Sequence, residues 1–188
     1  MVSIMPEKTA EPQRERIADA FLRHFSHFGF RKTSVDQVSR ELKISKKTVY
    51  QYFDTKEKIF YYVVHRIALD YCRKMELELE KVHSVREKIS RLLRMIFSES
   101  KKWLRANDAF EFRYKQEIGE LAFRDAYGDL LRRLIQSGME RGEFPRRDVE
   151  TTLGFIQGIL GETMKSLAKN PKQSMDDQAE QAVFRILS

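Results

Sequence analysis

The sequence predicts an all-α protein in which an N-terminal domain of three helices precedes a larger C-terminal helical bundle. Only eight Gly and four Pro occur among 188 residues, and apolar residues recur at spacings of three and four, the helical period. Positive charge concentrates at one end: residues 14–60 hold eleven Lys or Arg against six Asp or Glu, which is +5 of the total charge of +7. A basic N-terminal domain on a near-neutral body is typical of a protein that binds a polyanion.

The first helix is predicted from its apolar stripe of Ile17, Phe21, Phe25 and Phe28. We expect it to end at Gly29, because glycine accepts the left-handed backbone that terminates helices. Residues 1–12 are polar, contain two prolines and are expected to form a flexible tail. They carry no basic region followed by an apolar run, so secretion is not expected.

Two short helices should follow. Ser34 fits an N-cap, and the helix that it opens would bury Val35, Val38 and Leu42. Ser45 can cap a third helix from Lys46 to about Tyr52. This arrangement of two short helices around a tight turn predicts a helix-turn-helix, in which the second short helix presents its N-terminal side chains to DNA bases.

A long fourth helix should begin at Asp54 or Thr55, since an apolar stripe runs from Ile59 to Leu79. Further helices are expected at about 84–104, 107–117, 119–141, 148–168 and 175–187. We expect a domain boundary after residue 58, between a helix-turn-helix domain over 13–58 and a second helical domain over 59–188.

The segment ISKKTVYQYF, residues 44–53, carries the chemistry of DNA recognition. Val49 and Phe53 are four residues apart and should point inward, which leaves an outer surface rich in hydrogen-bond donors. Lysine can donate to guanine, and glutamine can pair bidentately with adenine.

The order G-F-x-x-T-S-V-x-x-V-(x)5-I-S-K-x-T-V-Y-x-Y-F-x-x-K-E, from Gly29 to Glu57, resembles the DNA-binding domain of TetR-type (TetR/AcrR) regulators. The resemblance implies that Lys46, Lys47 and Gln51 face bases. It also implies that Tyr50, Tyr52 and Lys56 grip phosphates and that Thr48 touches the backbone or a base methyl group. Ser34, at the positive end of its helix, can donate to a phosphate.

Two positions depart from the pattern of that family. Lys43 occupies a turn position usually held by glycine, so it must either adopt a left-handed conformation at some cost or close the turn differently. Lys47 follows Lys46 where the family often has a small residue, and it would either add a contact or crowd the groove.

The sequence gives little support for an enzyme or for a metal-binding protein. No Gly-rich phosphate loop, nucleophile elbow or HExxH motif occurs, so no catalytic residue is assigned and the protein is not expected to be an enzyme. His24 and His27 could offer two metal nitrogens, but no third ligand lies nearby in sequence, so neither a metal nor a cofactor is expected. Cys72 is the single cysteine, lies on an apolar stripe and should be inert.

Aromatic residues accumulate between Met95 and Tyr127. Most should be core, but the resemblance implies a cavity for a small effector in these helices, and an aromatic lining suits an apolar ligand. The residues that we assign to this pocket are Phe97, Trp103, Phe110, Tyr114 and Tyr127.

Gly154, Gly158 and Gly161 lie within one predicted helix, where each glycine costs roughly 1 kcal/mol against alanine. Helices keep such residues where backbones approach closely, either inside one subunit or across a dimer. The resemblance favours a dimer face completed by the last helix, through Ala179, Ala182, Val183 and Ile186.

The sequence therefore predicts a cytoplasmic homodimer that binds double-stranded DNA at a palindromic operator, with no membrane association. The favoured interpretation is a repressor released by a small, largely apolar effector. The alternative is a ligand-independent structural, nucleoid or division factor of the same fold, and an enzyme is the remote one.

Overall fold

The computed structural model describes the backbone of residues 7–106, 109–170 and 175–188, and the side chains of 11–101, 117–167, 169–170 and 175–188. These residues form eight helices and no strand, which confirms the all-α prediction. In chain order the helices are α1 (Glu7–Lys32), α2 (Val35–Glu41), α3 (Lys46–Tyr52), α4 (Lys56–Glu80), α5 (Val85–Ala106), α6 (Ala109–Glu140), α7 (Val149–Lys169) and α8 (Asp176–Ile186).

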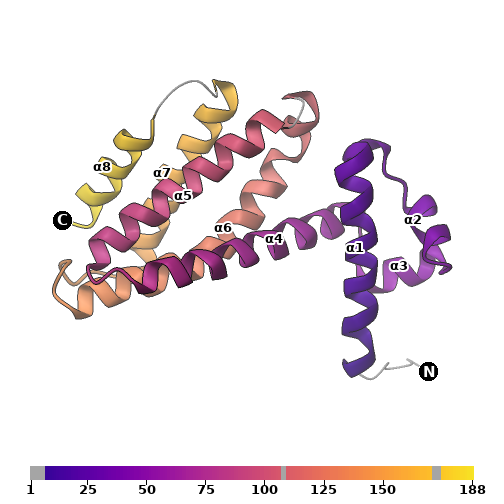
Figure 1. The fold of residues 1–188 in the computed structure, drawn as a ribbon, viewed down its shortest axis with the longest axis horizontal. Coiled ribbons are helices and arrows are strands. Elements are labelled where there is room, and N and C mark those ends of the chain that lie inside the picture. Colours follow the sequence, from indigo (N-terminus) through magenta and orange to yellow (C-terminus); the bar gives the residue numbers. More distant parts are fainter. Residues whose placement is uncertain (1–6, 107–108, 171–174) are drawn as a thin grey trace.

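The molecule has an N-terminal head and a larger body, and α4 runs from one into the other (Figure 1). The head consists of α1, α2, α3 and the first turns of α4, and its core is centred on Ile17, Phe21, Val49 and Ile59, each fully buried. The body packs the rest of α4 against α5, α6, α7 and α8 around a second core. At 25 residues, α4 is about 37 Å long, so it can reach through both parts.

The division between head and body falls inside α4, later than expected. Ile59, Val63 and Ile67 belong to the head core, whereas Ala68 is the first α4 residue of the body core. The head thus extends to about residue 67 and does not end at 58. The cause is geometric: the apolar stripe of one continuous helix faces two different cores in succession.

Three other expectations need correction. The first helix begins at Glu7, so residues 7–12 are helical despite Pro12; Glu, Lys, Ala and Gln are strong helix formers. The helices expected at 107–117 and 119–141 are one helix, α6, because a single interior glycine at 119 weakens a helix without ending it. Phe28 is 48 % exposed and lies against His24 and His27, while Phe30 takes the buried place beside Phe25.

Local capping follows the sequence closely. Ser34, Ser45 and Thr55 are the N-caps of α2, α3 and α4, and each side chain accepts a hydrogen bond from a backbone N–H of the first turn. Gly29 has φ 77°, a backbone conformation that favours glycine, and it breaks the helical geometry of α1 where the stop was predicted. Within the described parts of the chain, no helix is long and apolar enough to cross a membrane.

Candidate nucleic-acid interface

The turn between α2 and α3 is closed by Lys43 in the left-handed conformation. Its φ is 55°, the single positive value among the described non-glycine residues. This is the first of the two possibilities that the sequence left open. The turn brings the Ile44 N–H to the Ser39 carbonyl oxygen at 3.0 Å, and residues 42–45 alone connect α2 to α3.

The face that α3 presents to solvent is polar and donor-rich. Val49 and Phe53 are buried in the head core, as predicted. Lys46, Lys47, Tyr50 and Gln51 are exposed to solvent. The short helix is thus anchored by two apolar side chains, and its outer surface carries two cations and an amide.

Two of the donors on α3 already have partners in the free protein. The Lys46 ammonium lies 2.6 Å from the Asp36 carboxylate on α2, and both side chains are about half exposed. The Thr48 hydroxyl lies 2.9 Å from that of Ser45. An exposed ion pair contributes at most about 1 kcal/mol, so Lys46 can exchange its carboxylate for a DNA group at small cost.

Ser34 and Tyr52, two more of the predicted DNA-contact residues, are half-buried. The Ser34 hydroxyl oxygen accepts from the Asp36 N–H at 3.2 Å, which leaves the hydroxyl proton available to an outside acceptor. The Tyr52 ring packs against the head core. Both residues are therefore held in place by the head itself.

The contacts that Lys56 makes within the protein were not predicted from the sequence. Its ammonium donates to the carbonyl oxygens of Phe30 and Thr33, at 2.9 and 3.0 Å, and lies 4.2 Å from the centre of the Phe30 ring. These contacts join the start of α4 to the end of α1. The expected phosphate contact of Lys56 must compete with this internal use of its charge.

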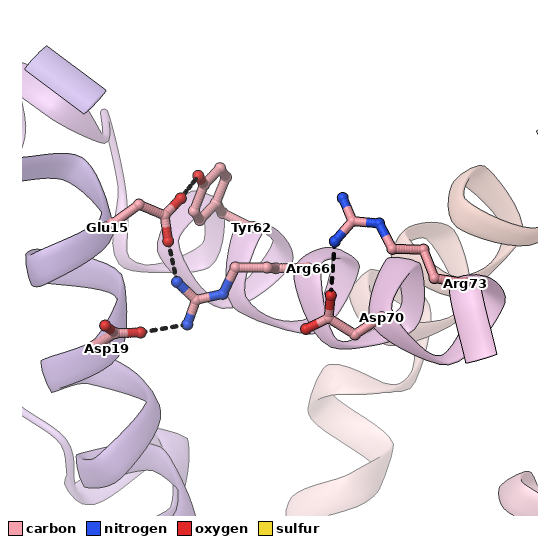
Figure 2. A network of polar contacts seen from close by, with 6 residues as sticks. All are labelled: Glu15, Asp19, Tyr62, Arg66, Asp70 and Arg73. Carbon is pink, nitrogen blue, oxygen red and sulfur yellow. Dashed lines mark hydrogen bonds and ion pairs between the residues drawn. The ribbon is translucent and has the colours of Figure 1, made fainter. Parts of the chain in front are cut away.

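A polar network fixes α1 against α4 (Figure 2). Tyr62 donates to the Glu15 carboxylate, and the Arg66 guanidinium donates to both Glu15 and Asp19. Burial and the hydrogen bond to Glu15 raise the pKa of Tyr62 to about 12, so its hydroxyl keeps its proton. The guanidinium of Arg14 lies over the rings of Phe53 and Tyr62, which continues the network to the end of α3.

This network was not predicted from the sequence, although the sequence contains a signal for it. Glu15 and Asp19 are four residues apart on one predicted helix, and Tyr62 and Arg66 are four apart on another. Two complementary pairs at this spacing can meet face to face when their helices cross. Charge patterning alone could not indicate that these two helices do cross.

His24 and His27, considered above as metal ligands, border an open hollow between α1 and Glu41 of α2. His24 lies 2.6 Å from the Glu41 carboxylate, which Arg23 also contacts. The hydrogen bonds of His24 and then of Arg23 lower the pKa of Glu41. No three His, Cys, Asp or Glu side chains among the described residues are grouped so that they could hold a metal ion.

The residues assigned to an effector pocket divide into two groups. Phe97 and Tyr127 are buried in the body core. Trp103, Phe110 and Tyr114 lie outside the residues whose side chains the structure describes. Cys72 is buried beside Tyr127, and burial raises the pKa of its thiol to about 12.

The glycines of α7 lie on an open face of the body. A Cβ atom placed on Gly154, Gly158 or Gly161 would meet no other part of the protomer within 4 Å. Tight packing inside one subunit is therefore not why α7 keeps them. Phe155, beside them, exposes 61 % of its surface.

The last helix contributes less to that face than expected. Ala179 and Val183 are buried in the body core and are unavailable to a partner, because α8 turns this side toward α7 and α5. Ala182 and Ile186 remain half-exposed.

The comparisons with known proteins agree with this geometry. Residues 17–63 match the family model "Bacterial regulatory proteins, tetR family". The "Fatty acid metabolism regulator protein" of Bacillus subtilis (strain 168) is 22 % identical over 179 residues, covering 88 % of this chain and 89 % of that protein. The match to residues 17–63 passes the start of α4, in keeping with a head core that extends beyond residue 58.

The fold is shared over nearly the whole chain. The crystal structure of RolR in complex with resorcinol superposes with a TM-score of 0.76 at 17 % identity, covering 97 % of this chain and 91 % of that one. Thermus thermophilus FadR, a transcriptional repressor solved with lauroyl-CoA, gives 0.71 at 18 % identity and covers 93 % of both chains. The head therefore matches the DNA-binding domain of the tetR family over residues 17–63, and the chain shares the fold of solved TetR-type regulators over 93–97 % of its length.

Proposed function

We propose that the protein is a dimeric repressor that binds a palindromic operator and is released from it by a small, largely apolar effector. The observation that carries the DNA-binding part is the surface of α3, where Lys46, Lys47 and Gln51 face solvent while Val49 and Phe53 anchor the helix. As part of this proposal the protein acts in the cytoplasm and is not an enzyme.

In this proposal α3 enters the major groove. Lys46, Lys47 and Gln51 read base edges, since lysine and glutamine side chains match the donor and acceptor patterns of guanine and adenine. Thr48, Tyr50, Tyr52 and Ser34 surround that surface and contact the phosphate backbone. Lys56 holds the α1–α2 connection in place through the carbonyl oxygens of Phe30 and Thr33, and in this way supports the phosphate contacts indirectly.

A palindromic site follows if two copies bind together. One seven-residue recognition helix contacts few base pairs, and two-fold symmetry doubles them. We assign the dimer contact to the open face of α7 at Gly154, Gly158 and Gly161, with Ala182 and Ile186 of α8 beside it. Glycines that meet nothing within the protomer leave room for a partner helix to approach closely.

The effector is assigned to the aromatic region of α5 and α6, with Phe97, Trp103, Phe110, Tyr114 and Tyr127 as candidate contacts. Two proteins of the same fold were solved with resorcinol and with lauroyl-CoA. A small phenol and a medium-chain acyl-CoA are therefore the first two compounds to test.

The test begins with selection of binding sites from a random DNA pool by the full-length protein. We expect an inverted repeat, and Gln51→Ala should change the preferred base at one position of each half-site. Failure of the wild type to enrich any sequence would reject the proposal.

Effector control is tested with the selected operator. Because Trp103 is the only tryptophan, its fluorescence reports binding of resorcinol or lauroyl-CoA to the body. An effector that weakens operator binding must itself bind more weakly to the operator complex, by the same factor. If neither these compounds nor a wider apolar panel changes operator affinity, the protein is the ligand-independent DNA-binding factor considered above.

A further inference from the structure

The first turns of α4 are bonded to the head on one side and to the body on the other. Tyr62 and Arg66 face α1 and donate to Glu15 and Asp19 (Figure 2). Tyr61, one residue before Tyr62 and therefore on a different side of the helix, donates to the Asp125 carboxylate of α6 at 2.6 Å. The Tyr61 ring is also stacked on the His65 ring, with the ring centres 5.6 Å apart, and this contact restricts the orientation of the Tyr61 side chain.

The contacts to α1 make this segment of α4 mechanically part of the head. The Arg66 guanidinium spans two carboxylates on successive turns of α1, and Ile59, Val63 and Ile67 belong to the head core. Residues 56–67 should therefore move together with α1, α2 and α3. Any change in the angle between head and body must then shift this segment across α6, where Asp125 lies.

We propose that the hydrogen bond from Tyr61 to Asp125 sets the angle at which the DNA-binding head is held on the body, so that both are positioning residues for α3. This inference rests on the proposed function for its consequence, because the head angle determines the separation of the two recognition helices in a dimer. The bond is accessible to solvent and joins neutral phenol to carboxylate, so it can open without unfolding either core.

The geometric part is tested without DNA. Ser26 on α1 and Ser98 on α5 are exposed and can be changed to cysteine for paired spin labels, while the natural Cys72 is buried. Labelled protein is diluted into unlabelled protein so that the distance within one protomer is measured. We expect Tyr61→Phe and Asp125→Ala to shift or broaden the distance distribution in the same way, and the double variant to add nothing further.

Tyr62→Phe is the matched control, because it removes the same hydroxyl one residue along but breaks a contact within the head. It should leave the distance distribution unchanged. A Tyr61→Phe distribution that superposes on that of the wild type overturns the proposal. Equal changes in Tyr61→Phe and Tyr62→Phe overturn it too, since they would indicate general loosening of the head.

The consequence for DNA is measured on the selected operator with its half-site spacing varied by one base pair at a time. Tyr61→Phe should change the affinity for the best spacing about fivefold, at the lower end of allosteric couplings, and Tyr62→Phe should not. A wild type that binds no DNA rejects the proposed function but leaves the distance result standing. Normal operator binding with an unchanged spacing profile in Tyr61→Phe rejects the positioning role alone.

Discussion

Replacing Lys56 by methionine distinguishes its internal contacts from the phosphate contact that the sequence pattern indicates. Methionine keeps an aliphatic side chain near the Phe30 ring and removes the charge. The ammonium of Lys56 donates to two backbone carbonyl oxygens at the end of α1, those of Phe30 and Thr33. Without it, these carbonyls lose a charged donor at the point where α1 turns into α2.

The expected cost follows from these two contacts. A hydrogen bond to a charged group contributes about 1.5–3 kcal/mol. The two bonds of Lys56 share one ammonium in a half-buried position, so we expect their joint loss to cost about 2–3 kcal/mol. For a chain of this size each 1 kcal/mol lowers the melting temperature by roughly 2–4 °C, which gives a decrease of about 4–12 °C.

Helical circular dichroism during heating and urea titration measures this change, with Lys58→Met as the matched control because Lys58 is exposed and two residues away. Operator binding is then followed against salt at a temperature where the variant is folded. An internal role leaves the salt slope as in the wild type, whereas loss of a phosphate contact lowers it by about one unit. Unchanged stability together with a reduced slope would refute the internal role.

Four further outcomes are expected. Gln51→Ala should weaken binding by about 1–3 kcal/mol to operators that carry the preferred base at one position of each half-site, and should change binding to other sequences little. Competition among operator variants measures this difference. Gly158→Leu should shift the protein toward monomer in sedimentation. Gly119 also has open space around it, so Gly119→Ala is the control: it should leave the oligomeric state unchanged and stabilise α6 by up to about 1 kcal/mol. Lys43→Gly should raise the free energy of unfolding by roughly 0.5–1 kcal/mol, because glycine adopts the left-handed φ of 55° without strain and this gain exceeds the added entropy of the unfolded chain. A higher midpoint in urea denaturation would show it. Glu143 accepts hydrogen bonds from backbone N–H groups and a hydroxyl at the start of α5, and these lower its pKa from 4.5. Glu143→Gln should therefore lower the free energy of unfolding by about 1 kcal/mol at neutral pH. Urea titrations should find that this difference disappears as the pH falls below 4.5 and through the lowered pKa of Glu143.

The sequence by itself determined the local elements of the head. Ser34 and Ser45 cap their helices as predicted, because a cap depends on a side chain and backbone groups two or three residues away. Val49 and Phe53 point inward because a helical period of 3.6 residues puts them on one face. The same local spacing produced the motif on which the prediction of DNA binding depends.

Tertiary structure alone decided which charged groups meet. Arg66 and Glu15 are 51 residues apart in the chain, and Lys56 is 26 residues from Phe30. It also decided that the head core extends into α4 and that Val183 lies inside the protomer. Such contacts depend on the angle at which helices cross, which follows from how side chains on two helices fill the space between them, and a pattern along one helix does not contain that angle.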